Sequence, residues 1–572
     1  MRMLVLMRVF AVAALLLATT TLRAEAPDRP NIILMMADDL GYSDLGSYGS
    51  EIETPNLDAL AAGGVKLSQF YNTGRCCPTR ASLLTGVYPH QAGVGHMTWL
   101  DSKLPGYRAD LSHDTPTLAE VLRSAGYATY MSGKWHVTIN DTPNKPKDNW
   151  PLQRGFDRFY GTIKGSGSYY DPAMLVRGDD PITPRSDPEY KPDDYYYTDA
   201  IADQAIRYIS ENTTQADAAS GKPFFLYVAF TAPHWPLHAP AETIAKYKGK
   251  YDAGYEPIRA ARFARMKQLG AIEASAELSP APQTWSAAKN KEWEARCMEV
   301  YAAQIDRMDQ NVGRIVAALK ETGELENTLI VFLADNGGCD ENNGRAPMPK
   351  RTNAAATQPR PVDEPQLASN PPFTLDGVPV RTGPAVMPGG AESFIAYGRN
   401  WANVSNTPFR EYKHYVHEGG ISTPFIASWP AKLKRAEEFI AQPTHLIDVM
   451  PTCVEIANTT FPKSVGGRAT TPMQGVSLLP LLTGGSTERS SPIFFEHEGN
   501  RAIRDGNWKL VAKGTNGPWE LYDISIDRSE RHDLATAQPD RVQQMSVAWQ
   551  TWAETAQVLP LTPQERKGGQ PD

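Results

Sequence analysis

Three runs of consecutive apolar residues stand out along the first two-thirds of the chain. They span Asn31 to Ala37, Pro223 to Phe230 and Thr328 to Ala334, and acidic residues directly follow the first and the third. A continuous apolar run of this length is typical of a strand that is buried on both faces, as in a parallel sheet. The pattern therefore predicts three buried parallel strands.

Other segments place apolar residues at helical spacing. Leu57 to Ala62 and Thr117 to Ala125 predict helices, and the apolar positions between Val300 and Leu319 predict a long helix from about 295 to 321. We interpret the stripe on this long helix as core packing. Strands that alternate with helices predict an α/β fold, in which helices cover both faces of one sheet.

Two regions break this alternation. Residues 340–400 are rich in Pro, Ala, Asn and Gly, which predicts a long irregular excursion that borders the active site. From about Ser491 the pattern changes to short strands with a helix near 540–556, which predicts a small antiparallel C-terminal subdomain. The predicted strands are Pro492 to Phe495, Ala502 to Arg504, Trp508 to Ala512 and Trp519 to Tyr522.

The first residues resemble a secretory signal peptide. A basic start precedes the apolar run Val9 to Leu17, which is too short for a comfortable membrane span. We predict a signal peptide over residues 1–24, cleaved near Ala24 or Ala26. The mature protein is then expected to be periplasmic or secreted, with no membrane segment.

Composition narrows the classes of function. The chain has 572 residues and a formal charge of -8, and it contains no basic tract of the kind that nucleic acid requires. Five cysteines in a chain of this length do not make a disulfide scaffold. The length predicts one large domain, over 27–485, and the smaller subdomain over 486–572.

Polar residues follow two of the predicted strands. Asp38 and Asp39 end the first, and Asp335 and Asn336 end the third. Each pair alone is also typical of a turn or a helix cap. The carboxyl ends of strands in an α/β sheet line the ligand crevice, and an all-oxygen set there selects Ca²⁺ or Mg²⁺.

The segment Cys76-Cys77-Pro78-Thr79-Arg80, followed by Leu84-Thr85-Gly86, is the strongest motif. By itself it is also compatible with a buried or disulfide-bonded pair of cysteines beside a turn. It resembles the signature of the type I sulfatases, in which the first Cys is oxidised to formylglycine. Only Cys76 stands two residues before the Pro and four before the Arg.

Three further segments fit the same family. They are Gly133-Lys134-Trp135-His136, Thr231-Ala232-Pro233-His234, and Lys413 five residues before Glu418-Gly419-Gly420. A lone His or Lys is usually a solvated side chain, and the order of these segments beside strand ends is what makes them specific. The C-terminal segments His497 to Arg504 and Trp519 to Asp523 are similar to bacterial arylsulfatases.

Two features depart from the family pattern. His136 is followed by Val137-Thr138 instead of Leu-Gly, and the family's sulfate-contacting Ser has no clear match, with Ser166 and Ser168 as candidates.

The resemblance implies the fold and the site. The fold is that of the alkaline phosphatase superfamily: a large mixed sheet between helices plus a small C-terminal antiparallel sheet. One divalent cation, Ca²⁺ before Mg²⁺, and a formylglycine-generating maturation enzyme acting on Cys76 are expected, with no other cofactor. The implied catalytic residues are Cys76, Arg80, Lys134, His136, His234 and Lys413, and the implied metal ligands are Asp38, Asp39, Cys76, Asp335 and Asn336.

The implied reaction is hydrolysis of a small-molecule sulfate monoester through a formylglycine diol and a covalent sulfated enzyme, which then eliminates sulfate. The similarity of His497 to Arg504 favours small aryl or alkyl esters over polysaccharides, and steroid and carbohydrate sulfates remain alternative substrates. Two alternatives remain: a formylglycine-dependent phosphonate monoester hydrolase or phosphodiesterase, and a non-catalytic exported binding protein in which Cys76 stays a thiol.

Overall fold

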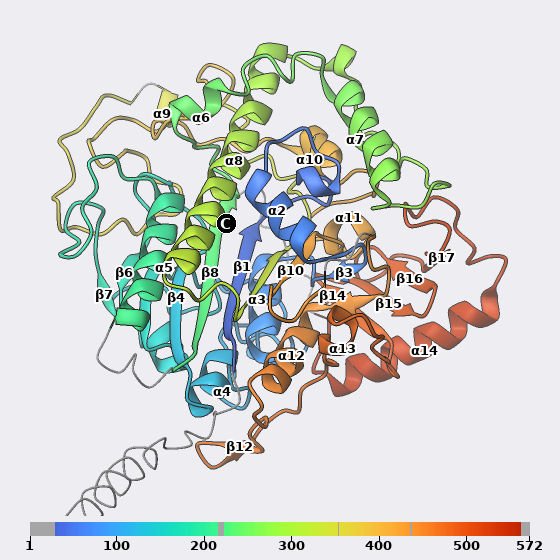
Figure 1. The fold of residues 1–572 in the computed structure, drawn as a ribbon. Helices are drawn as coiled ribbons and strands as arrows, with labels where there is room; N and C mark the ends of the chain where they lie inside the picture. The colour runs from blue at the N-terminus through green and yellow to red at the C-terminus, as the bar shows by residue number, and fades with distance from the viewer. Residues whose placement is uncertain (1–28, 215–221, 353, 435–437, 562–572) are drawn as a thin grey trace, which may run out of the picture.

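A nine-stranded mixed sheet lies at the centre of the computed structural model (Figure 1), in the order β2-β10-β9-β1-β8-β4-β5-β6-β7. The structure describes residues 29–214, 222–352, 354–434 and 438–561. The predicted signal peptide and its cleavage site lie outside these ranges. None of the helices within them combines the length and the apolar character needed to cross a membrane.

The middle of the sheet consists of four parallel strands. β1 (Asn31–Asp38) pairs with β8 (Phe224–Pro233) on one side and with β9 (Thr328–Ala334) on the other, and β8 pairs with β4 (Ala128–Lys134). Every residue of β1 and β9 is buried. The three predicted parallel strands are confirmed, although β8 continues to Pro233.

Shorter strands extend the sheet on both sides. β10 joins antiparallel to β9, β5 joins parallel to β4, and β6 and β7 follow antiparallel. Their bounds are β2 (Val65–Leu67), β5 (Arg158–Thr162), β6 (Leu175–Arg177), β7 (Asp180–Pro181) and β10 (Phe425–Ser428). Outside this sheet, β3 (Phe70–Tyr71) pairs with β11 (Thr444–His445).

Alternate residues of β1 enter two separate cores. Ile33, Met35 and Ala37 belong to the core under α8 (Lys291–Glu321), whereas Ile32, Leu34 and Met36 belong to the core on the opposite face. On the first face α5 (Tyr197–Thr214) and α2 (Pro55–Gly63) pack against α8. On the second lie α3 (Cys76–Thr85), α4 (Leu118–Ser124) and α12 (Val449–Ile456). The prediction of a sheet covered on both faces is confirmed.

The predicted helices form with shifted ends. α8 begins at Lys291, four residues before the predicted start. The sequence pattern did not reveal this first turn, because three of its four residues are charged and Trp293 alone is apolar. Thr117 is the N-cap of α4 and forms a capping box with Glu120. The remaining helices are α6 (Ala241–Ala245), α7 (Tyr255–Leu269), α9 (Pro349–Thr352), α10 (Arg399–Ser405), α11 (Glu418–Ile421) and α13 (Leu479–Leu482).

The C-terminal residues form a second, four-stranded antiparallel sheet, shown in orange and red in Figure 1. Its strands are β14 (Ile493–His497), β15 (Asn500–Asp505), β16 (Trp508–Ala512) and β17 (Glu520–Asp523), and α14 (Pro539–Thr555) packs against it. A small apolar core joins this sheet to Tyr71, Val416 and Ile421 of the larger part. This sheet and its helix were predicted.

Candidate active site

The polar residues after β1 and β9 meet, because these two strands are neighbours in the sheet. The backbone N–H of Asp39 donates to Asp335 Oδ1 at 3.2 Å, and Asn336 Nδ2 donates to Asp39 Oδ1 at 2.6 Å. Asp38, Asp39, Asp335 and Asn336 are all buried. The structure therefore places three carboxylates and one amide at one edge of the sheet.

Two oxygens of this group lack a partner. Asp38 Oδ1 and Asn336 Oδ1 are buried and accept no hydrogen bond from any residue that the structure describes. Burying an acceptor without a partner is costly, and such groups are rare in native proteins. Carboxylate and amide oxygens are the ligands that hard divalent cations prefer, so these residues fit a Ca²⁺ or Mg²⁺ ion. Burial, followed by the Asp38 charge, raises the pKa of Asp335 to about 7.

Three buried cations surround the carboxylates. Lys134, the last residue of β4, donates to Asp38 Oδ2 at 2.6 Å. Arg80 of α3 donates to Asp335 Oδ2 at 2.8 Å and lies 3.5 Å from Asp38 Oδ2. Lys413 Nζ lies 3.0 Å from Asp39 Oδ1. Burial acts to raise the pKa of Asp39, but Lys413 and His234 lower it overall, which keeps this carboxylate ionised.

Cys76 lies at the N-terminus of α3, where the helix dipole favours negative charge. Its sulfur, the sulfur of Cys77 and a ring nitrogen of His136 all lie within 4.8 Å of one another. Cys77 Sγ is 3.1 Å from His136 Nε2, and the structure, which describes all five cysteines, shows no disulfide between them. Burial lowers the pKa of His136 to about 4, so its imidazole is a neutral base near neutral pH.

His234 follows β8 and faces Lys413. Its Nδ1 donates to the carbonyl oxygen of Trp235 at 2.6 Å, because a carbonyl can only accept. Its Nε2 is then the acceptor, and Lys413 Nζ donates to it at 3.3 Å. Burial lowers the pKa of His234 to about 4. Lys413 is thus the group of this pair that carries a proton near neutral pH.

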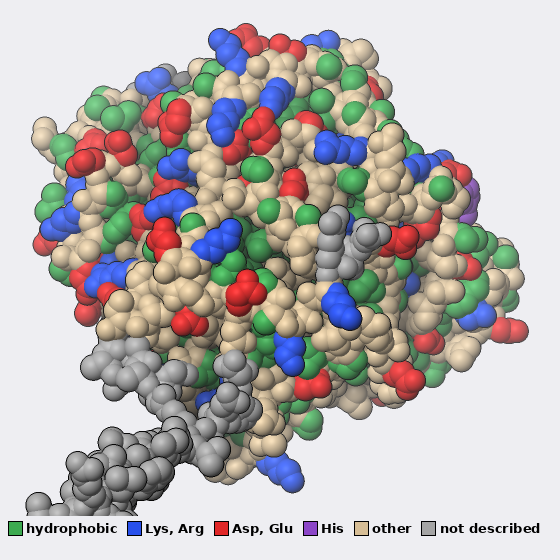
Figure 2. Space-filling view, viewed as in Figure 1, with side chains coloured by type: hydrophobic (Ala, Val, Ile, Leu, Met, Phe, Trp, Pro, Cys, Tyr) green, Lys and Arg blue, Asp and Glu red, His purple; other side chains and the backbone are tan. Residues whose placement is uncertain are grey.

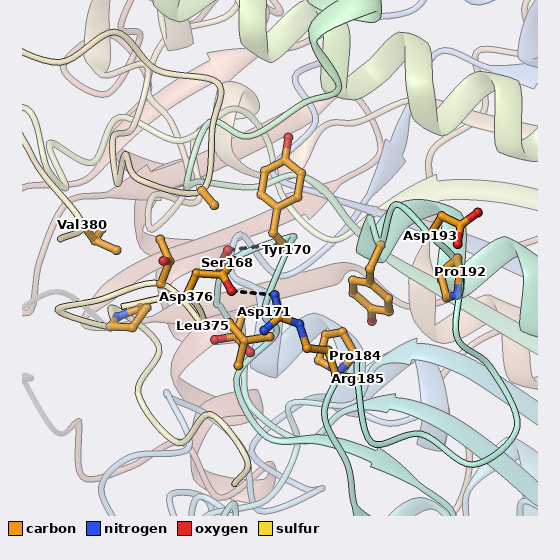
Figure 3. A pocket seen from close by; sticks show the side chains of 14 residues that line it. Ser168, Tyr170, Asp171, Pro184, Arg185, Pro192, Asp193, Leu375, Asp376 and Val380 are labelled. Atoms are coloured by element: carbon orange, nitrogen blue, oxygen red, sulfur yellow. Dashed lines mark hydrogen bonds and ion pairs between the residues drawn. The ribbon is translucent and has the colours of Figure 1, made fainter. Parts of the chain in front are cut away.

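The residues implied by the resemblance converge on one buried cluster, but Ser168 does not join it. The Ser168 hydroxyl accepts a hydrogen bond from the Tyr170 amide at 3.2 Å and lies 3.5 Å from His238 Nδ1. It lines a cavity of about 210 Å³ (Figure 3), in whose wall Arg185 donates to Asp376 at 2.7 Å. Residues from the excursion over 340–400 form one side of this cavity.

Several residues near the cluster were missed by the sequence analysis. They are Arg75, Cys77, Glu341, His414 and Glu498, which contact one another or the predicted site residues. Arg75 and Cys77 flank Cys76, so their proximity to the nucleophile could have been read from the motif. A single Glu in a Pro- and Gly-rich segment carries no such signal, because only the tertiary fold brings Glu341 to this site.

Comparisons with known proteins agree with this geometry. The family described as Sulfatase matches residues 30–459, and the one described as N-sulphoglucosamine sulphohydrolase, C-terminal, matches residues 411–551. An uncharacterized sulfatase of Schizosaccharomyces pombe is 33% identical over 574 residues, covering 93% of this chain and 94% of the relative. An arylsulfatase of Klebsiella aerogenes is 36% identical over 478 residues, which cover 80% of this chain and 92% of the relative.

Solved structures share the fold. The crystal structure of Ps i-CgsB has a TM-score of 0.62 at 25% identity and covers 92% of this chain and 93% of its own. The PsFucS1 sulfatase from Pseudoalteromonas sp. has a TM-score of 0.58 at 20% identity. The match covers 94% of this chain and 92% of the PsFucS1 chain. The predicted sulfatase fold of the alkaline phosphatase superfamily is therefore confirmed. On the family match, which spans most of its length, the chain belongs to the sulfatase family and is a sulfuric ester hydrolase.

Proposed function

We propose that this chain is an arylsulfatase-type enzyme that hydrolyses sulfate monoesters of small aryl or alkyl alcohols, with Cys76 converted to formylglycine. The observation that supports this most strongly is the buried cluster in which Asp38 and Asn336 each have an oxygen without a partner among the described residues, while Lys134 contacts Asp38 and Lys413 contacts Asp39. The name of the Klebsiella relative supports the aryl class of substrate.

In this proposal, Asp38, Asp39, Asp335, Asn336 and an oxygen on residue 76 hold one divalent cation, Ca²⁺ before Mg²⁺. When bound, the cation supplies positive charge that makes a hydroxyl more acidic and draws electrons from the sulfuryl group. In this structure the sulfur of Cys76 stands in for one hydroxyl of the hydrated aldehyde. Arg80 holds Asp38 and Asp335 in place through its guanidinium.

The other side chains then have distinct roles. Residue 76 attacks sulfur in line and becomes covalently sulfated, while Lys134 and Lys413 neutralise the sulfuryl oxygens. The Lys413–His234 pair passes a proton to the departing alcohol oxygen. His136 removes the proton from the second hydroxyl of residue 76, the aldehyde re-forms, and sulfate leaves.

The test is the mass of the peptide containing Cys76 together with the turnover of Cys76→Ser. In protein made with a formylglycine-generating enzyme, the peptide should be lighter by the thiol-to-aldehyde difference. Cys76→Ser has no second hydroxyl, so it should accumulate a sulfated enzyme or lose turnover, whereas Cys453→Ser, a buried thiol in α12, should keep it. Sustained turnover by Cys76→Ser would contradict the scheme.

We also infer export to the periplasm or the medium, with a signal peptide over 1–24, a catalytic part over 27–485 and a subdomain over 486–572. The basic start and the short apolar run at the N-terminus support export. N-terminal sequencing of the mature protein tests this, and an intact N-terminus on protein recovered from the periplasm would contradict it.

A further inference from the structure

Glu341 contacts residues that are adjacent in sequence to three of the proposed catalytic side chains. Arg75, which precedes Cys76, donates to Glu341 Oε1 at 3.1 Å. Trp235, which follows His234, donates to Glu341 Oε2 at 2.7 Å. His414, which follows Lys413, donates to Glu341 Oε1 at 3.1 Å. One carboxylate from the irregular segment over 340–400 thus joins three separate parts of the site.

The carboxylate of Glu341 also lies close to Lys413 itself. Lys413 Nζ is 3.8 Å from Glu341 Oε2, and the Glu341 side chain is only 15% exposed. Burial acts to raise the pKa of Glu341, but the charges of Lys413 and Arg75 hold it well below its usual range. A negative charge therefore lies 3.8 Å from the lysine that is assigned to the sulfuryl oxygens.

The polar network continues into the C-terminal sheet. His414 Nδ1 donates to Glu498 Oε2 at 3.0 Å, and Glu498 lies in the turn between β14 and β15. The Glu498 side chain is 13% exposed. A second partly buried carboxylate is therefore linked to Glu341 through the imidazole of His414.

We propose that Glu341 determines specificity by charge, so that the site selects esters with one negative charge and rejects phosphate monoester dianions. The inference rests on the proposed function, because it places the anionic group of the substrate against Lys413. A sulfate monoester carries one negative charge, whereas a phosphate monoester carries about 1.5 to 2 at pH 7. Coulomb repulsion grows with the substrate charge, so Glu341 penalises the dianion more than the monoanion.

The test compares kcat/KM for 4-nitrophenyl sulfate with kcat/KM for 4-nitrophenyl phosphate. At an effective dielectric constant of about 20, one unit charge about 10 Å from the anionic group of the substrate alters the preference by roughly tenfold. Glu341→Gln should therefore shift the sulfate-to-phosphate ratio toward phosphate by about tenfold. Glu341→Asp keeps the charge and should leave the ratio unchanged, even where loss of the Arg75 and Trp235 contacts lowers both rates.

Glu364→Gln is the matched control, because Glu364 is an exposed carboxylate of the same segment. It should leave both rates unchanged. Equal losses on both substrates in Glu341→Gln would mean a purely structural role and would overturn the inference. If that variant does not fold, Glu498→Gln replaces it, and an unchanged ratio there overturns the inference as well. Absence of sulfate ester hydrolysis in the wild-type enzyme would instead contradict the proposed function.

Discussion

At the scale of single residues, the imidazole of His136 is held from several directions. Its backbone lies in the left-handed region at φ 54°, its Nε2 faces Cys77 Sγ at 3.1 Å, and Gly165 lies against its ring. A non-glycine residue at positive φ is uncommon and persists where the surrounding structure enforces it. The fold thus fixes the direction from which the proposed base approaches residue 76.

Gly165→Ala tests this placement. A Cβ at position 165 would lie 2.0 Å from His136 Cε1, so the ring must move, although the backbone of Gly165 itself accepts alanine. Because a misplacement of about 1 Å can cost about 100-fold, we expect kcat for sulfate ester hydrolysis to fall by about that factor. Gly63→Ala, where an added Cβ meets no atom within 4 Å, should leave kcat unchanged. Steady-state kinetics of both variants decide the point, and a wild-type kcat in Gly165→Ala would refute this role.

The sequence identifies residues that follow a motif but misses residues that act through distant contacts. Asp38 and Asp335 could be predicted because each follows a buried apolar strand, and Cys76 because of its Pro and Arg. Glu341 could not, because its partners Arg75, Trp235 and His414 are far from it in sequence. For the candidate Ser168 the structure shows contacts of its hydroxyl with His238 and Tyr170.

At the scale of elements, the agreement between predicted and observed bounds depends on how much of an element is buried. β1 and β9, buried along their whole length, have bounds close to those predicted. β2, β6 and β10 were not predicted, because three or four residues do not establish a periodic pattern. β16 was predicted with its bounds, yet the sequence did not reveal that its Lys509 is buried in an ion network.

Lys509 of β16 joins the C-terminal sheet to the larger part of the protein. Its Nζ lies 2.9 Å from Glu418 Oε1 of α11 and 2.8 Å from Glu530 Oε1, and all three side chains are buried. Lys509→Met leaves both carboxylates buried without their shared cation. We therefore expect the free energy of unfolding to fall by about 3 to 5 kcal/mol, measured by urea denaturation.

Lys513→Met is the matched control for Lys509→Met. Lys513 directly follows β16 in the turn after Ala512, pairs with Glu411, and its side chain is 40% exposed. Because the Lys513 ammonium is open to water, although Glu411 is only 9% exposed, this variant should lose clearly less stability than Lys509→Met does. Equal losses of unfolding free energy in the two variants would show that the buried Lys509 network stabilises the fold no more than the Lys513 pair does.

At the scale of the whole molecule, the surface and the site differ in how charge is arranged. On the face shown in Figure 2, Lys and Arg side chains are interspersed with Asp and Glu. In the site, by contrast, Asp38, Asp39 and Asp335 lie together at the carboxyl ends of β1 and β9, away from water. Because these carboxylates repel one another when ionised, the stability of the fold depends on the positive charges that neutralise them.

A bound divalent cation should therefore raise the thermal unfolding temperature of the whole molecule. A ligand that binds only the folded state at about 100 times its Kd adds about 2.7 kcal/mol. We expect Ca²⁺ added to chelator-treated protein to raise the unfolding temperature more than Mg²⁺ does, because Ca²⁺ tolerates irregular sets of oxygen ligands and Mg²⁺ demands octahedral geometry. Differential scanning fluorimetry measures this without any substrate.

The matched variants of this experiment are Asn336→Ala and Asn212→Ala. Asn336 offers the buried, unpaired Oδ1, so its removal should shrink the Ca²⁺-dependent rise in unfolding temperature. Asn212 lies in α5 and contacts Tyr130 at the opposite end of β4 from Lys134, so its removal should leave that rise intact. An identical rise in both variants would place the cation elsewhere, and no rise in the wild type would argue that Lys134, Arg80 and Lys413 alone balance the three carboxylates.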